Sequence, residues 1–526
     1  MSSMVFERLC QIVGTSELVT MRRDLNDFSE MVTPLFNPQA YCCVMYSGSH
    51  REGFKLPDSD RDSMFWPKTN RVIWNLSQSQ LYSRKTLILS DCSQSPPGFV
   101  LLQLLFPATT LIQIHSACFT LHGKEYISSS AIRNNMSPLS VRPKCRIHGP
   151  CSSGIFRGVE FDDAYCFASD FWPPVALAWI DRCQSWPSPH VVDDIFRNGC
   201  QFVAIEHKLG NHEENEWRIS FSLAEQKLVY TMNHCQFLTY GLLKLILKEV
   251  IKERIEKSLL CSYHMKTAVF WPIQQSLTPH WYPENFLKCF WVCFKLLKWV
   301  YEGVCPNFLV PENNMFLTNI FGESQRKLFL ELYGLYEKGM ALLLHSHSIR
   351  TMITTGLCIP GLRMYNSEDD EEIVFDLNLF IELRSNNPMF IPTRNSWFEF
   401  PKIMETLMNE ELTNYQVLAV QYLMVNNLQS TPFLLHSRCA NTAENKLMYK
   451  ADKISRYMLK LVEKIGFFSD ILFLVMYYYK TFRYMNLQKA KIYFAQPYIM
   501  HLHYVNSKRY IEAFGGQTSE SKMSKL

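Results

Sequence analysis

The hydrophobic pattern of this 526-residue chain changes near residue 223. Before this point, short runs rich in β-branched and aromatic residues, such as NRVIWNLS (70–77) and CQFVAIEHK (200–208), predict strands because turn residues bound them. After it, apolar residues recur at spacings of three and four, which is typical of amphipathic helices. This order predicts an α/β fold in which a mixed sheet is followed by a helical lobe.

The chain is long enough for several packed units, because one hydrophobic core rarely serves more than about 250–300 residues. The turn-rich stretch 128–160 predicts an exposed loop or insertion, and the acidic NSEDDEE (366–372) predicts a linker. The expected organisation is an N-terminal helical segment (1–40), a sheet core with the functional site (41–230), a helical lobe (231–365), a helical C-terminal extension (366–515) and a disordered tail (516–526).

The composition limits which binding partners and which cellular compartment are expected for this chain. A net charge of +4 gives no general attraction to nucleic acid, so any nucleic-acid surface would be a local patch. The 17 cysteines lack paired C-x-x-C spacing, which favours free thiols and a cytoplasmic location. No secretory signal is visible, and each apolar stretch is too short or too polar to span a membrane. The terminal Ser524, Lys525 and Leu526 leave a peroxisomal address as the alternative.

The stretch GSHREGFKLPDSDRDSMFW (48–66) carries the first chemical signal. Gly48 lets the backbone approach a phosphate closely, and Ser49 offers a hydroxyl and an N–H group. Asp60 and Asp62 lie two residues apart, so on a strand both carboxylates face the same side, where a divalent cation relieves their repulsion. Taken alone, however, the stretch favours an ordinary turn followed by a solvated strand.

A third carboxylate changes this interpretation. In VEFDDAYCF (159–167), strand alternation puts Asp162 on one face and Asp163 on the other, and either could be the relevant acid. If Asp162 faces Asp60 and Asp62, three carboxylates could hold two Mg²⁺ ions that bridge a triphosphate. The alternative is that this pair of acids only ends an exposed strand.

These residues, in this order, resemble the nucleotidyltransferase core of the male-abnormal (Mab) family of cGAS-like receptors, which are relatives of cyclic GMP-AMP synthase. Four further blocks follow in the family's order and extend the resemblance to about residues 40–350: EWRISFSLAE (216–225), LLKLILKEV (242–250), CSYHMKTAVFW (261–271) and PNFLVPENNMF (306–316). The resemblance implies a two-lobed nucleotidyltransferase fold, with a mixed twisted sheet and a helical lobe, followed here by an all-helical C-terminal region.

The resemblance also implies residue roles. Asp60, Asp62 and Asp162 would be catalytic and would bind Mg²⁺ or Mn²⁺. The implied nucleotide-binding residues are Gly48, Ser49, Arg218, Ser220, Ser222, Lys244, Ser262 and Tyr263. Among them, Gly48 and Ser49 would hold the donor triphosphate, Lys244 would reach phosphate, and Tyr263 would stack on a base.

Several of these positions have structural alternatives. Arg218 could pair with Glu225, Lys248 competes with Lys244 for the phosphate-binding role, and Tyr263 could be a core residue. The polar Arg61 and Ser63 depart from the apolar residues that the family prefers there, which predicts a wetter strand face.

The zinc module with which the vertebrate enzyme clamps DNA is not visible in its expected place. TMNHCQF offers only His234 and Cys235, and CRIHGPC (145–151) lacks a clear fourth ligand and is interpreted as a loop.

The resemblance implies a synthase of a cyclic dinucleotide, with ATP and GTP as substrates, acting in innate immune signalling. Its activator would be double-stranded RNA rather than DNA, and the C-terminal helices could bind a protein partner. Two alternatives remain at this stage. One is a catalytically silent scaffold of the same fold in signalling or development, and the other is a template-independent polymerase that extends RNA ends.

Overall fold

The computed structural model describes most of the first 350 residues and parts of the rest. The described residues are 1–36, 40–56, 60–106, 112–136, 145–156, 159–212, 214–255, 259–276, 280–294, 296–350, 375–379, 381–383, 396–439, 445–465 and 477. The chain divides into two compact units, Met1–Asn386 and Asn387–Leu526.

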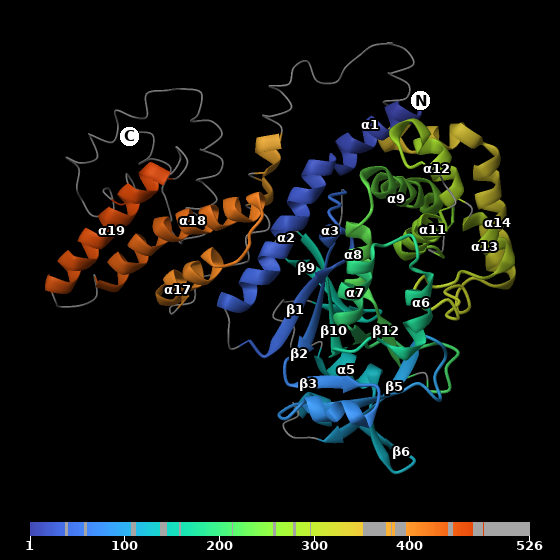
Figure 1. The fold of residues 1–526 in the computed structure, drawn as a ribbon, viewed down its shortest axis with the longest axis horizontal. Helices are drawn as coiled ribbons and strands as arrows, with labels where there is room; N and C mark the ends of the chain where they lie inside the picture. Colours follow the sequence, from blue (N-terminus) through green and yellow to red (C-terminus); the bar gives the residue numbers. More distant parts are fainter. Residues whose placement is uncertain are drawn as a thin grey trace. The chain divides into compact units, whose positions relative to one another are not determined.

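Among the described residues of the first unit, twelve strands form one mixed sheet (Figure 1). Its main order is β1-β2-β10-β11-β12-β5-β4-β3, with β9 and β8 added beside β10, and β7 and β6 beside β5. The pairs β2–β10 and β3–β4 are parallel. The strands are β1 (Cys42–Ser47), β2 (Arg61–Pro67), β3 (Asn70–Ile73), β4 (Thr86–Asp91), β5 (Phe99–Phe106), β6 (Cys118–Leu121), β7 (Lys124–Ile127), β8 (Arg146–His148), β9 (Cys151–Phe156), β10 (Val159–Ser169), β11 (Cys200–Val203) and β12 (Trp217–Ser220).

The predicted helical lobe follows the sheet and confirms the expected fold class. Helix α9 (His234–Ile246) begins at a capping box, in which Asn233 and Gln236 each accept a hydrogen bond from the other's backbone N–H at 2.9 Å. It continues into a π-helical turn, Leu247–Ile251. The other helices after the sheet are α8 (Ser222–Tyr230), α10 (Lys252–Arg254), α11 (Ser262–Gln274), α12 (Phe286–Cys293), α13 (Leu296–Glu302) and α14 (Gly322–Glu337). Helices α6 (Leu177–Arg182) and α7 (Pro189–Arg197) lie between β10 and β11 in the sequence.

Two helices, α1 (Ser2–Val13) and α2 (Ser16–Phe36), precede the sheet. Gly14 separates them with a φ of 127°, a conformation that side chains other than glycine rarely adopt. The apolar residues of α1 lie four apart at Val5, Leu9 and Val13, and all three are buried in the core. Figure 1 shows α2 running past the short helix α3 (Gly48–Arg51) and strand β1.

The expected exposed loop over residues 128–160 is wrong for its described parts. They form helix α5 (Ser129–Met136) and a hairpin of β8 and β9. Strand β9 pairs with β10 from Phe156 opposite Val159 to Cys151 opposite Ala164. The polar composition misled the prediction because backbone hydrogen bonds to the edge of β10, rather than apolar side chains, recruit this strand.

The described residues of the second unit are helical, as predicted for the C-terminal extension. They form α17 (Ser396–Met408), α18 (Asn414–Cys439) and α19 (Asn445–Ile465), and α18 packs against both of the others. The proposed linker at 366–372, most of the segment after 465, the tail and the terminal tripeptide lie outside the described residues. In the parts of the chain that are described, no helix combines the length and the apolar character that crossing a bilayer requires.

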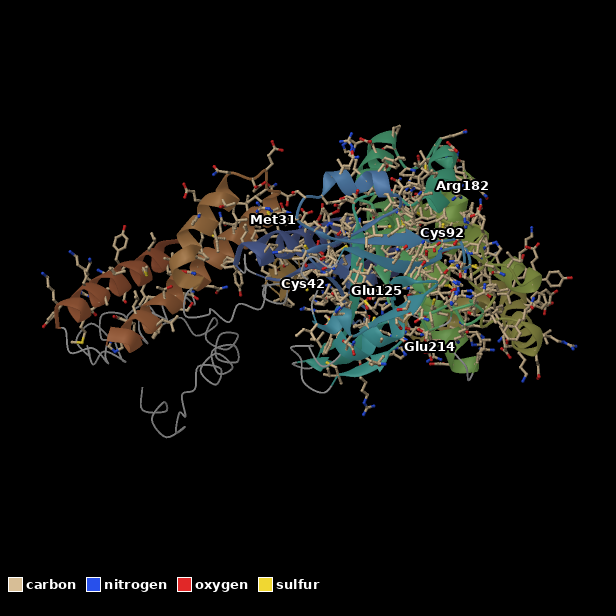
Figure 2. All side chains as sticks on the ribbon, turned by 90° about the horizontal axis from the view of Figure 1, so that it is seen from below. Met31, Cys42, Cys92, Glu125, Arg182 and Glu214 are labelled. Atoms are coloured by element: carbon tan, nitrogen blue, oxygen red, sulfur yellow. The ribbon has the colours of Figure 1, made fainter. Side chains whose placement is uncertain are left out.

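Arg182 joins helix α6 to the helical lobe. Its Nη1 donates to Gln274 Oε1 at 3.0 Å, its Nη2 donates to the Phe308 carbonyl, and its guanidinium lies 4.5 Å from the centre of the Trp271 ring. Figure 2 shows the packed side chains of this unit and labels Arg182 on the side away from Cys42 of β1. The two lobes are therefore fastened together by specific polar contacts as well as by the apolar core.

Substitution of Trp217 tests how much the apolar core contributes to stability. Its side chain is fully buried, and its Nε1 donates to the Ile127 carbonyl at 2.8 Å. We expect Trp217→Ala to lower the free energy of unfolding by about 3–5 kcal/mol, because a large cavity and an unpaired carbonyl would remain. Urea denaturation followed by circular dichroism would measure this, with the exposed Leu81→Ala as the control. Equal denaturation midpoints for the two variants would contradict the assignment.

Candidate functional site

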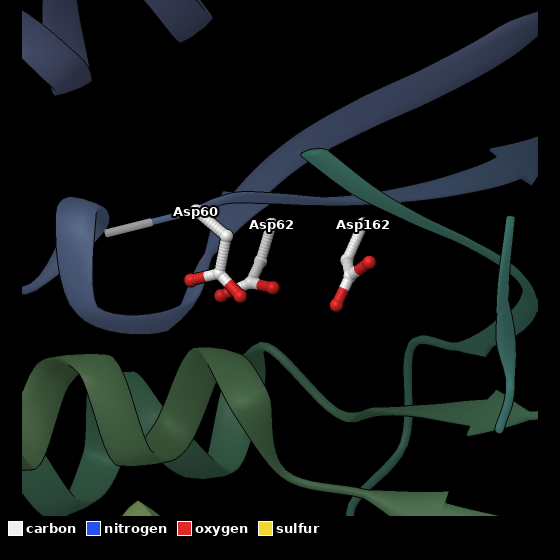
Figure 3. Close-up of side chains that lie close together, drawn as sticks. All are labelled: Asp60, Asp62 and Asp162. Carbon is white, nitrogen blue, oxygen red and sulfur yellow. The ribbon is translucent and has the colours of Figure 1, made fainter. Parts of the chain in front are cut away.

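Three carboxylates converge where strands β2 and β10 run side by side. The parallel register places Asp162 directly opposite Asp62. Asp60 immediately precedes β2, and ligand oxygens of the three acids lie within 4.8 Å of one another (Figure 3). Among the described residues, this is the group of His, Cys, Asp and Glu side chains that could share a metal ion.

The structure differs from the expected strand in two details. Asp60 lies before the first residue of β2, so it reaches the cluster from the preceding loop and not from the pleated face. Asp163 pairs in register with Ser63, one position along from Asp162, and therefore points to the other face of the sheet. Ser63 is only 3% exposed, so the prediction of a more solvated strand face is wrong at this position.

Gly48 is fitted to the carboxylate of Asp62. It has a φ of 69°, and a Cβ atom at this position would lie 1.5 Å from Asp62 Oδ2. The preceding Ser47 pairs with Asp62 across β1 and β2. No residue with a side chain fits here without displacing the acid, so the glycine turn and the carboxylate cluster form one structural unit.

The crowding of the three acids changes the acidity of Asp62. Burial, followed by repulsion from Asp60 and Asp162, raises the pKa of Asp62 from 3.8 to about 7. A cluster that resists ionisation in this way gains free energy when a cation neutralises it. Its hard oxygen ligands fit Mg²⁺ or Mn²⁺, so the residues present fit the expected metal.

Lys244 reaches the glycine turn from helix α9. Its Nζ donates to the hydroxyl of Ser49 and lies 4.6 Å from the centre of the Phe54 ring. Burial lowers the pKa of Lys244 from 10.5 to about 8, although Glu52 and the acidic cluster oppose this shift. Lys248, the competing residue, is exposed on the following π-helical turn. The geometry therefore favours Lys244 for contact with a ligand at Ser49.

The remaining predicted residues lie on two elements. Ser220 ends strand β12 and its hydroxyl lies 2.9 Å from that of Ser222, whereas Arg218 on the same strand is exposed. Ser262 is the first residue of α11 and is exposed. Tyr263 is half-buried, and its hydroxyl accepts a hydrogen bond from Asn307 Nδ2 at 2.9 Å. These contacts position the side chains of Tyr263, Ser220 and Ser222 in the absence of a ligand.

The sequence did not single out a buried ion network beside the site. Lys266 Nζ lies 2.6 Å from Glu52 Oε1 and 3.2 Å from Glu225 Oε2. Glu225 is therefore paired with Lys266, in place of the Arg218 partner considered from the sequence. The signal was present in CSYHMKT, because Lys266 lies three residues after Tyr263 and one helical turn brings both to the same face of α11.

This network connects three parts of the site. Glu52 directly follows helix α3, Glu225 belongs to α8, and Lys266 belongs to α11. The two carboxylates raise the pKa of Lys266 well above its usual value against the opposing effect of burial. A charged Lys266 thus ties the glycine turn to the helix that carries Tyr263.

A mixed sheet with three converging acids, next to a glycine-serine turn and a helical lobe, defines the class of nucleotidyltransferase-fold proteins. Comparison with family models agrees. Residues 130–231 match the Mab-21 protein nucleotidyltransferase domain, and residues 235–332 match the Mab-21 protein HhH/H2TH-like domain. The two matches support a Mab-21 and cGAS-like family member over residues 130–332. Gly48, Ser49, Asp60 and Asp62 lie N-terminal to the matched residues.

Two curated relatives share part of the chain. It is 29% identical to cyclic GMP-AMP synthase of Mus musculus over 176 residues, which cover 30% of this chain and 33% of that protein. It is 27% identical to cyclic GMP-AMP synthase of Sus scrofa over 189 residues, which cover 32% of this chain and 37% of that protein. The chain thus matches about a third of the length of each relative.

The raised pKa of Asp62 predicts how stability depends on pH in the absence of metal. Between about pH 4 and pH 7, an unfolded chain has released a proton that the folded protein retains, so the free energy of unfolding falls as pH rises. We expect Asp62→Asn to be more stable than the natural protein at pH 8, by on the order of 1–4 kcal/mol. The difference should shrink toward pH 4.

Thermal unfolding with a chelator present would measure this effect, and added Mn²⁺ should then raise the melting temperature of the natural protein but not that of Asp62→Asn. A variant that is less stable than the natural protein at pH 8 under chelation would contradict the repulsion described for the cluster.

Proposed function

We propose that this protein is a metal-dependent nucleotidyltransferase that joins two nucleoside triphosphates into a cyclic dinucleotide. The observation that carries the proposal is the convergence of Asp60, Asp62 and Asp162 beside the turn of Gly48 and Ser49. Divalent cations bound by such a cluster would neutralise the triphosphate and activate the attacking hydroxyl. The similarity to two proteins named cyclic GMP-AMP synthase supports the cyclic product.

The other residues would hold the nucleotides. Ser49 and Lys244 would bind the phosphates of the donor, because the short helix presents N–H groups there and the buried ammonium already touches the serine hydroxyl. Arg218 is exposed on β12 and would fork to a phosphate or to a base edge. Tyr263 would stack on a base, with Ser220, Ser222 and Ser262 lining the same pocket.

The reaction would proceed through two displacements. A ribose hydroxyl would attack the α-phosphate of the donor, and pyrophosphate would leave. In a second displacement, a ribose hydroxyl would attack the remaining α-phosphate, which would close the ring and release a second pyrophosphate. ATP and GTP are the expected substrates. We propose that double-stranded RNA, bound on a local basic patch, activates the enzyme in innate immune signalling in the cytoplasm, and that the C-terminal helices bind a protein partner.

Asp162 and Asp163 provide a matched pair for testing the metal site. We expect Asp162→Asn to lower the rate at least about a hundredfold, because it removes a carboxylate from the cluster, whereas Asp163→Asn should retain most activity. The assay would incubate labelled ATP, GTP, CTP and UTP with Mg²⁺ or Mn²⁺, with and without double-stranded RNA or DNA. A small phosphatase-resistant product indicates cyclisation, and extended RNA indicates a polymerase.

If the folded natural protein forms no product under any of these conditions, the alternative is favoured, namely a Mab-family scaffold without catalytic activity. The convergence of three acids within 4.8 Å argues against that alternative, because such crowding is unfavourable unless a cation relieves the repulsion.

Lys244 and Lys248 offer a second matched pair, four residues apart on the same helical stretch. Removing a charge that contacts the triphosphate should weaken nucleotide binding, so we expect Lys244→Met to raise KM for the donor by about tenfold to a hundredfold. Lys248→Met should leave KM unchanged because that side chain is exposed. Steady-state kinetics would decide, and the reverse result would move the phosphate-binding role to Lys248.

A further inference from the structure

Helix α2 binds the backbone of the turn that follows the glycine-serine pair. Arg23 Nε donates to the Glu52 carbonyl at 2.9 Å, and Asn26 Nδ2 donates to the His50 carbonyl at 3.2 Å. Arg22 Nη1 donates to the Gly53 carbonyl at 3.2 Å. These carbonyls lie at or just after the end of helix α3, and that of His50 also accepts a hydrogen bond from the Gly53 N–H at 3.1 Å. Side chains of α2 therefore hold the turn in one conformation.

The guanidinium of Arg22 is in turn oriented by a residue more than three hundred positions away. Glu382 Oε1 accepts a hydrogen bond from Arg22 Nε at 3.1 Å and another from Lys55 Nζ at 2.9 Å. The side chain of Glu382 is 1% exposed and that of Arg22 is 8% exposed, whereas Lys55 is 41% exposed. Glu382 thus contacts the segment between Ser49 and Asp60 both directly and through Arg22.

Glu382 lies in a helical stretch that follows the predicted linker and belongs to the first compact unit. Both family matches end before it, since the second one stops at residue 332. Removal of this buried carboxylate would leave the guanidinium of Arg22 without its acidic partner. Loss of Glu382 is therefore expected to loosen the segment that Arg22 and Lys55 contact.

We propose that Glu382 is a positioning residue for the donor-phosphate turn. By fixing Arg22 against the Gly53 carbonyl and by holding Lys55, it sets the position of Gly48 and Ser49 relative to Asp62. This late stretch of the first unit would thereby support a site whose reacting groups lie in the first 250 residues. The effect on nucleotides rests on the proposed function, whereas the holding of the turn does not.

Hydrogen exchange on the full chain tests the holding without any assay of activity. The N–H groups of Glu52, Gly53 and Phe54 donate to the carbonyls of Gly48, His50 and Ser49. We expect Glu382→Gln to speed exchange of these amides about tenfold or more, with β4 and β5 unchanged. Asp376→Asn removes an exposed acid from the same stretch and should change nothing. Unchanged exchange in the turn, or equally faster exchange throughout the sheet, would overturn the proposal.

A second variant covers the case in which Glu382→Gln does not fold. Lys55→Gln removes the more exposed partner and should speed exchange of the same amides to a smaller extent. If it leaves them unchanged, the proposal is wrong.

Kinetics then test the consequence for the nucleotide. In an active natural protein, we expect Glu382→Gln to raise KM for the donor triphosphate about tenfold while kcat changes less than about threefold. An unchanged KM would overturn the link to the nucleotide. Inactivity of the natural protein would instead count against the proposed function, and the exchange result would still decide whether Glu382 holds the turn.

Discussion

Mutual repulsion among Asp60, Asp62 and Asp162 is the constraint on which the site depends. The parallel pairing of β2 with β10 forces Asp62 and Asp162 side by side, and burial together with this crowding raises the pKa of Asp62. The surrounding elements place positive charge and hydrogen-bond donors nearby, with Lys244 at Ser49 and Lys266 between two glutamates. The fold thus holds three carboxylates in a cluster that a bound cation would stabilise.

The position of the Asp62 carboxylate also restricts the backbone of the glycine turn. Only glycine fits at position 48 beside the Asp62 carboxylate. Side chains of α2 donate hydrogen bonds to the backbone carbonyls of His50, Glu52 and Gly53 in the turn that follows. Family similarity covers the nucleotidyltransferase domain from residue 130 and the helical domain after it. The turn, helix α2 and Glu382 lie outside those matches, so their arrangement is evident from the structure of this chain.

Much of the fold could be predicted because hydrophobic period is a local property. The change from short strands to helices near residue 223, and the helices of the C-terminal extension, follow from that period. The hairpin of β8 and β9 could not be predicted, since a polar strand is recruited by the backbone edge of β10. Likewise, alternation separated Asp162 from Asp163, but it could not place Asp60 in a loop before β2.

The sequence by itself determined the residue types of the site, their order and the class of fold, because spacing and chemical type are written in the chain. Only the tertiary structure decided which of them meet. It brought Lys244 to Ser49 and left Lys248 exposed, and it paired Glu225 with Lys266. It also carried Glu382 to Arg22 and Lys55, a contact across more than three hundred residues. Such contacts depend on packing between distant segments, which no local pattern specifies.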